Sequence, residues 1–84
     1  MTSWLLKWKP KAVRELTALW NQSSEKAAVT KAVHQLEQAL SRNPMTFGES
    51  RVGLQRMAFE KPLCINFEVI PDDHKVIVIS VREW

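Results

Sequence analysis

Hydrophobic and polar residues alternate most clearly near the end of the chain, in residues 63–84. Residues 63–70 alternate with a period of two, which predicts a strand with one buried and one open face. Residues 76–81 carry apolar side chains at nearly every position, as in a strand with neighbours on both edges. The polar turn at 71–74 joins the two runs into a predicted hairpin. We therefore expect residues 75–82 to form an interior strand that needs a second neighbour.

A second alternating stretch, residues 4–9, predicts a short strand at the start of the chain. Its apolar face carries Trp4, Leu6 and Trp8, and its other face carries Lys7 and Lys9. Outward lysines discourage unwanted strand pairing, which suits a strand at the edge of a sheet. Pro10 then ends the strand and is typical of the first turn of a helix.

Apolar residues recur with helical spacing in residues 11–20 and again in about 25–41. A short polar link, residues 21–24, separates the two stretches and predicts an antiparallel helix hairpin. Asn43 and Pro44 end the second helix. The apolar stripes that we expect to face the core consist of Val13, Leu16, Leu19 and Trp20 in the first helix and Val29, Ala32, Val33, Leu36 and Leu40 in the second.

Residues 51–60 predict a third strand, in which the apolar positions change parity halfway. A bulge near Gln55 and Arg56 would place Val52, Leu54, Met57 and Phe59 on one face. The last three strands then form an antiparallel meander, and the first strand remains as the second neighbour of the last. We expect one α+β domain spanning residues 1–84, a two-layer β-α-α-β-β-β fold with sheet order 1-4-3-2 and the helix hairpin on one face.

Composition limits the classes of function. The chain has 84 residues and a net charge of +3, enough for one small core and for mild attraction to anionic partners. No apolar run reaches the roughly 18 residues of a membrane span, and the N-terminus does not resemble a signal peptide. One cysteine and two distant histidines predict neither a disulfide nor a metal site. We expect a cytoplasmic protein with no cofactor and no membrane partner.

The basic residues are the candidate chemical groups. Arg51, Arg56, Lys61 and Arg82 could hold RNA phosphates and offset the charge of a pentavalent transition state, or they could serve solubility alone. Trp84 could stack on a base, whereas Trp4, Trp8 and Trp20 are expected in the core. Cys64 is interpreted as structural, and His34 and His74 as solvated side chains.

Three segments carry a resemblance to a known family. They are Leu-Lys-Trp-Lys-Pro-Lys-Ala running into Val-Arg-Glu-Leu (6–16), the loop from Asn-Pro to Gly-Glu-Ser-Arg (43–51), and the hairpin at 63–82. In their order and spacing they resemble the RelE/ParE toxin superfamily of type II toxin–antitoxin systems. The resemblance implies the same fold as the alternation pattern. It also implies a cognate antitoxin, which we expect to lie as an acidic amphipathic segment across the basic surface.

The resemblance leaves the cellular target open between translation, by cleavage of mRNA on the ribosome, and DNA gyrase. As a metal-independent endoribonuclease, the chain would use Arg56 and Arg82 in catalysis and Arg51, Lys61 and Trp84 in substrate binding. The ribonuclease branch has Tyr-Arg-Val-x-Tyr where this chain has residues 63–67, so Cys64 replaces its arginine. The alternative is an inactive or orphan RelE-like module that binds a protein without catalysis. A homodimer is also left open.

Overall fold

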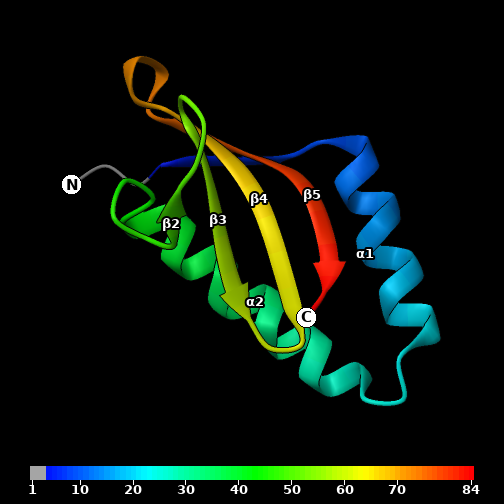
Figure 1. The fold of residues 1–84 in the computed structure, drawn as a ribbon. Coiled ribbons are helices and arrows are strands. Elements are labelled where there is room, and N and C mark those ends of the chain that lie inside the picture. The colour runs from blue at the N-terminus through cyan, green and yellow to red at the C-terminus, as the bar shows by residue number, and fades with distance from the viewer. Residues whose placement is uncertain (1–3) are drawn as a thin grey trace.

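The computed structural model describes residues 4–84 of the chain. Two helices and five strands follow one another in an α+β arrangement, with a 3-10 turn before the last strand (Figure 1). In chain order the elements are β1 (Leu5–Trp8), α1 (Pro10–Gln22), α2 (Lys26–Arg42), β2 (Glu49–Ser50), β3 (Gln55–Glu60), β4 (Leu63–Ile70), the turn Pro71–Asp73, and β5 (Lys75–Glu83).

The strands form one sheet with the order β1-β5-β4-β3-β2. The pair of β1 and β5 is parallel and the other pairs are antiparallel, so the sheet is mixed. The predicted α+β class is confirmed. The predicted order of four strands in the sheet is also confirmed and corresponds to β1-β5-β4-β3. The structure adds β2 outside β3, where Glu49 pairs with Met57 and Ser50 with Arg56. A strand of two polar residues has no periodic pattern, which explains why the sequence did not predict it.

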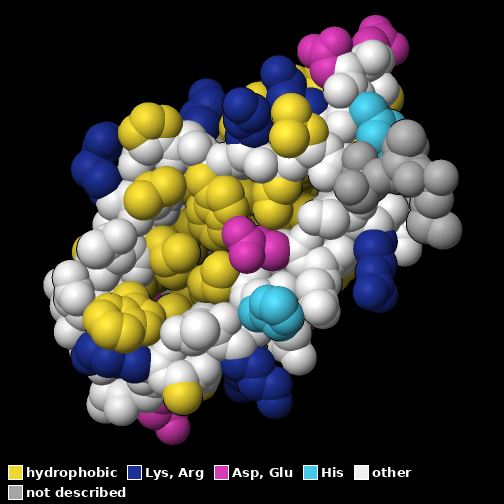
Figure 2. Space-filling model, turned by 180° about the vertical axis from the view of Figure 1, so that it is seen from behind, with side chains coloured by type: hydrophobic (Ala, Val, Ile, Leu, Met, Phe, Trp, Pro, Cys, Tyr) yellow, Lys and Arg dark blue, Asp and Glu magenta, His cyan; other side chains and the backbone are white. Residues whose placement is uncertain are grey.

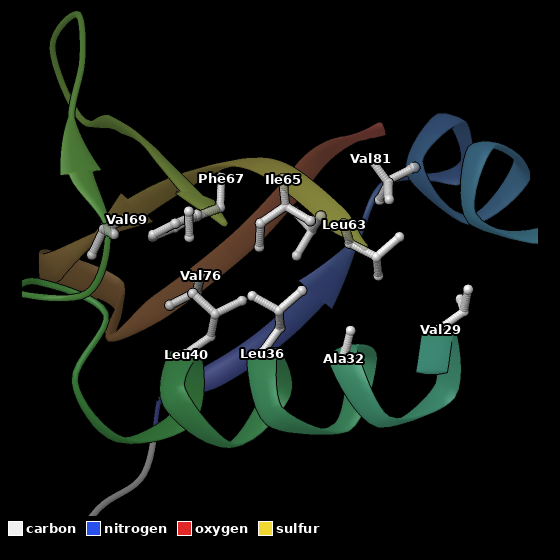
Figure 3. Close-up of a cluster of buried hydrophobic side chains, with 13 residues drawn as sticks. Val29, Ala32, Leu36, Leu40, Leu63, Ile65, Phe67, Val69, Val76 and Val81 are labelled. Atoms are coloured by element: carbon white, nitrogen blue, oxygen red, sulfur yellow. The ribbon is translucent and has the colours of Figure 1, made fainter. Parts of the chain in front are cut away.

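The hydrophobic core lies between α2 and one face of the sheet (Figure 3). Helix α2 contributes its stripe at helical spacing, and the sheet contributes the alternate residues of β4 together with residues of β5. The side chains with almost no exposure include Leu36, Leu40, Leu63, Ile65, Phe67 and Val78. Each such side chain contributes about 1.5 to 3 kcal/mol by leaving water, which makes this layer the main source of stability.

Strand β3 presents to α2 the opposite face from the predicted one. Arg56 pairs with Phe67 and Ala58 with Ile65, both buried, so Arg56 and Ala58 face α2. Met57 and Phe59 therefore face the open side of the sheet. The predicted bulge near Gln55 and Arg56 is wrong, because the β3–β4 register is continuous and the irregularity lies in the β4–β5 pair, between Asn66 and Phe67.

The physical reason is the register with β4, in which the buried Phe67 and Ile65 fix the face of the sheet that packs on α2. The small Ala58 is fully buried there, whereas Phe59 on the other side of the strand is exposed. Val52 and Leu54, the other two members of the predicted apolar face, precede β3 in the turn and are exposed to solvent. Their positions in the alternation therefore did not indicate which face of β3 is buried.

Helix α1 lies beside β5 rather than flat on the sheet (Figure 1). Strand β1 pairs with β5 only as far as Val78, and α1 runs along the part of β5 that β1 leaves uncovered. Ala12 is the residue of α1 that is fully buried. Val13 and Trp20 keep 47% and 41% of their surface exposed, so the prediction that they belong to the core is wrong. Trp4 and Trp8 pack against the core as expected.

Candidate functional site

The candidate site is the open face of the sheet, on the side away from α2. The registers of β3, β4 and β5 place Phe59, Cys64 and Arg82 side by side across three strands. Asn66 and Ser80 follow in the next row and are joined by a hydrogen bond of 3.0 Å from the amide Nδ2 to Oγ. We call the group formed by Arg51, Met57, Phe59, Lys61, Cys64, Arg82 and Trp84 the open-face site.

An aromatic pair occupies one end of this site. The rings of Phe59 and Trp84 are 5.1 Å apart and inclined by 51°, and Lys61 Nζ lies 5.3 Å from the centre of the Trp84 ring. The amide of Trp84 donates a 2.8 Å hydrogen bond to the carbonyl of Pro62, which fixes the terminal residue against the β3–β4 turn. Both rings are substantially exposed, Trp84 by 56%, so they form a platform on which a base could stack.

The arginines of the site are available to an anion. Arg82 is exposed and forms no ion pair with another side chain of residues 4–84. The guanidinium of Arg51 donates to the Glu49 carboxylate at 3.0 Å and lies 3.6 Å from Met57 Sδ. An exposed pair of this kind is weak and can be exchanged for a phosphate. The positive charges of both arginines act on Cys64, so both are available to an anion bound near it.

Cys64 is a neutral thiol in this setting. Burial raises the pKa of its Sγ, and the positive charges of Arg82 and Arg51 offset only part of that effect. A thiol with a raised pKa is a poor nucleophile at neutral pH. The interpretation of Cys64 as a structural residue therefore stands, and its small, uncharged side chain occupies the centre of the open-face site.

Arg56 does not share this face. Its Nε donates to the carbonyl of Phe47 at 2.9 Å and its Nη2 to the carbonyl of Gly48 at 3.0 Å, so it ties β3 to the loop after α2. The structure brings Arg51, Lys61, Arg82 and Trp84 to the open-face site and leaves Arg56 on the helix side. Sequence reasoning missed Phe59 and Met57, which only the strand register identifies as site residues.

A carboxylate from α1 fixes the end of β5 next to the site. Glu15 Oε1 accepts a 2.9 Å hydrogen bond from the backbone N–H of Val81, the residue before Arg82. Strand β1 pairs with β5 on that edge only as far as Val78, and within residues 4–84 no strand continues the pairing, so the carboxylate takes the place of a strand partner at Val81. The same carboxyl group forms an ion pair of 3.2 Å with Lys11. The hydrogen bond from Val81 is the main cause of a lowered pKa of Glu15.

This lowered pKa predicts an acid-dependent loss of stability. The carboxylate contributes stability above its ordinary pKa of 4.5, and the contribution is lost as the pH falls through the lower folded value. Glu15→Gln keeps an acceptor for Val81 and should remove this part of the pH dependence, as followed by urea unfolding at several pH values. An unchanged pH profile in Glu15→Gln would contradict the assignment.

No group of three or more His, Cys, Asp or Glu side chains within residues 4–84 is arranged to hold a metal ion. Neither helix within residues 4–84 has the length and hydrophobicity that a membrane span requires. The two histidines lie outside the open-face site. His34 is on α2, and His74 stacks on Trp4 with ring centres 4.0 Å apart.

Comparison with known proteins identifies the fold. No protein-family model and no curated protein sequence matches the chain. Among solved structures, the chain is similar to the toxin–antitoxin complex RelBE2 from Mycobacterium tuberculosis, with 17% identity, a TM-score of 0.79 and coverage of 100% of this chain and 94% of that one.

Two further structures agree with this result. The chromosomal ParDE system from P. aeruginosa has 21% identity and a TM-score of 0.71, with 95% of both chains covered. The isolated E. coli RelE toxin has 17% identity and a TM-score of 0.69, with 95% of this chain and 83% of that one covered. The chain therefore has the RelE/ParE-like toxin fold, as its sequence resemblance implied.

Proposed function

We propose that this chain is the toxin of a type II toxin–antitoxin system and that it acts on translation by binding mRNA at the open-face site. The observation that carries the proposal is the combination of two exposed arginines, Arg51 and Arg82, with the exposed Phe59–Trp84 platform on one face of a RelE/ParE-like fold. Cationic groups next to exposed aromatic rings are typical of surfaces that hold single-stranded nucleic acid.

The chemistry assigned to the site is electrostatic. Arg82 and Arg51 bind the phosphate and offset the charge that develops on its oxygens during cleavage. Trp84 and Phe59 stack on the neighbouring base, and Lys61 pairs with the adjacent phosphate of the RNA. Arg56 acts from the helix side, where it holds the loop at Phe47 and Gly48. Charge stabilisation of this kind needs no metal ion.

The partner in this proposal is an antitoxin. Two of the solved structures to which the chain is similar are named as toxin–antitoxin complexes or systems, RelBE2 and ParDE. The chain carries a net charge of +3, which favours an acidic partner. Neutralisation by a cognate antitoxin is therefore part of the proposed function.

A second candidate is a binding module that has lost catalysis. The neutral thiol of Cys64 stands where the ribonuclease branch has an arginine, and neither histidine lies in the open-face site. A module of this kind would use the same face and Trp84 to hold a partner, without cleaving RNA.

Controlled induction of the chain in a bacterial culture tests the proposal. We expect growth arrest with loss of protein synthesis, measured by incorporation of a labelled amino acid, while plasmid supercoiling stays normal. Arrest with intact synthesis and altered supercoiling would replace mRNA by gyrase as the target. Normal growth with soluble, folded protein would favour the inactive binding module.

A further inference from the structure

The last strand of the sheet, β5, contains a bulge near its end. Neighbouring residues of β4 pair with Ser80 and Val78, so that Ile79 is one extra residue in β5. A bulge of this kind bends the strand and changes the direction of the side chains that follow it. Bulges are frequent next to active sites, where they aim a side chain.

The bulge determines the face of the sheet on which Arg82 lies. Val76 and Val78 are buried on the helix side, and regular alternation would place Arg82 on that same side. After the bulge the alternation is shifted by one residue, so that Val81 is buried in the core and Arg82 pairs with Cys64 on the open face. The position of this arginine therefore depends on the bulge.

Two hydrogen bonds hold the bulged part of β5 from different sides. On the open face, Asn66 Nδ2 donates to Ser80 Oγ at 3.0 Å. At the edge of the strand, the backbone N–H of Val81 donates to Glu15 Oε1 on α1 at 2.9 Å. Glu15 Oε2 lies 3.2 Å from Lys11 Nζ, so both oxygens of this carboxylate have a partner that fixes its orientation.

The guanidinium of Arg82 acts on groups of two different elements. The pKa of Glu15 on α1 is lowered first by the hydrogen bond from Val81, and the positive charge of Arg82 is among the smaller causes. Burial raises the pKa of the Cys64 thiol on β4, and the same guanidinium offsets part of this rise. The pKa of the thiol therefore responds to the position of Arg82.

We propose that Glu15 is a positioning residue of the open-face site: its carboxylate holds the backbone of β5 at Val81 and thereby aims Arg82 at an anion bound beside Cys64. Glu15 itself does not touch the anion. The proposal rests on the proposed function in taking this anion to be a phosphate of RNA. It gives α1 a part in the chemistry, although this helix contributes no residue to the open-face site.

Alkylation of Cys64 by iodoacetamide measures the position of Arg82 without RNA. Cys64 is the only cysteine of the chain, and its thiolate is the reactive form, so the rate at about pH 8 follows the pKa of the thiol. Arg82→Ala is the reference variant and should slow the reaction by about two-fold or more, because a charge that favours the thiolate is lost. Glu15→Ala should slow it by a similar factor, since Arg82 is then no longer held near the thiol.

Two conservative variants separate the hydrogen bond from the charge of Glu15. Glu15→Gln keeps an acceptor for the N–H of Val81 without the charge and should react within about 1.3-fold of the unmodified chain. Glu15→Asp keeps the charge on a shorter side chain that does not reach Val81, so it should react as slowly as Glu15→Ala. It serves as the test if Glu15→Ala does not fold.

Glu37→Ala is the matched control. Glu37 is also a helix carboxylate that accepts a hydrogen bond, from Trp8 Nε1 at 3.2 Å, but it lies on α2. It lines a hollow between α1 and α2 on the helix side, and Figure 2 shows the hydrophobic floor of this hollow with an acidic side chain beside it. Its removal should leave the alkylation rate of Cys64 unchanged.

Binding of a labelled single-stranded RNA, followed by fluorescence anisotropy, tests the link to function. Glu15→Ala should weaken binding by about three-fold or more, and Glu15→Gln should restore it. Unchanged RNA binding in a Glu15→Ala chain whose Cys64 reacts slowly would overturn the proposal.

Three alkylation results would also overturn it: unchanged rates in both Glu15→Ala and Glu15→Asp, equal slowing in Glu15→Gln and Glu15→Ala, or equal slowing in Glu37→Ala. The growth experiment is independent of these results. Slow alkylation in Glu15→Ala together with normal growth on induction of the unmodified chain would refute the proposed function alone. Growth arrest by the unmodified chain together with unchanged alkylation in the Glu15 variants would refute the positioning role alone.

Discussion

Replacing Arg51 and Arg82 together by alanine is expected to abolish growth arrest while leaving the chain folded. Both side chains are exposed, and the one ion pair that is lost, between Arg51 and Glu49, is a weak surface pair. Removal of a single donor to a developing negative charge lowers catalytic rates by about 100-fold or more, and this change removes two such groups. Growth after induction is the measurement, with circular dichroism to confirm folding.

The control is a double variant with the same loss of charge on the helix side. Arg14→Ala combined with Lys31→Ala removes two exposed cations from α1 and α2 and should leave growth arrest unchanged. A loss of toxicity in both double variants would mean that net charge, not the open-face site, is responsible. Full toxicity of the Arg51 and Arg82 variant would remove these residues from the mechanism.

The largest expected effect on stability comes from Gly48→Ala. Gly48 has a φ of +75°, and a Cβ there would collide with the backbone carbonyl oxygen of Met57 and approach Ala58 Cβ to 3.1 Å. The loop cannot move away freely, because Arg56 donates to the carbonyl of Gly48 at 3.0 Å. We expect a loss of about 3 to 5 kcal/mol in the free energy of unfolding, measured by urea denaturation.

Gly53→Ala is the matched control for this change. Gly53 also has a positive φ, +61°, but a Cβ there would meet no atom within 4 Å. The expected loss is about 1 to 2 kcal/mol, the cost of the left-handed conformation alone. Equal losses in the two variants would show that the contact with β3 at Met57 does not constrain the loop.

Much of the fold was predictable because the hydrophobic pattern of residues 63–84 indicates both strands of the hairpin. Strand β4 alternates without interruption, and β5 is apolar on both faces, so the hairpin and the need for a second neighbour follow directly. The first strand was the remaining candidate for that place, and β1 does pair with β5. Local alternation and a count of available partners were enough for this part of the fold.

The facing of β3 was not predictable in the same way. Met57 and Phe59 have the hydrophobicity of core residues, yet pairing with Asn66 and Cys64 places them on the open face. A shift of one residue in register turns every side chain of a strand to the other side, and the sequence of β3 alone does not fix that register. The pairing with β4 decides it, since Ala58 lies opposite the buried Ile65 and Arg56 opposite the buried Phe67.

The same limit applies to the candidate site. Arg56 and Arg82 look equivalent in the sequence, but the register places Arg56 beside Phe47 and Gly48 and Arg82 beside Cys64. The exposure of Trp20 has a related cause. It depends on α1 resting beside the edge of β5, which helical periodicity does not reveal.

Binding of single-stranded RNA observed by NMR tests the central claim most directly, because tryptophan side chains report on both sides of the molecule. An unstructured oligoribonucleotide would be added to the labelled chain while the indole N–H signals are followed. The account predicts that the Trp84 signal shifts on addition of RNA, that the Trp20 signal does not, and that binding weakens with rising salt. An unmoved Trp84 signal, or a shift confined to Trp20, would contradict it.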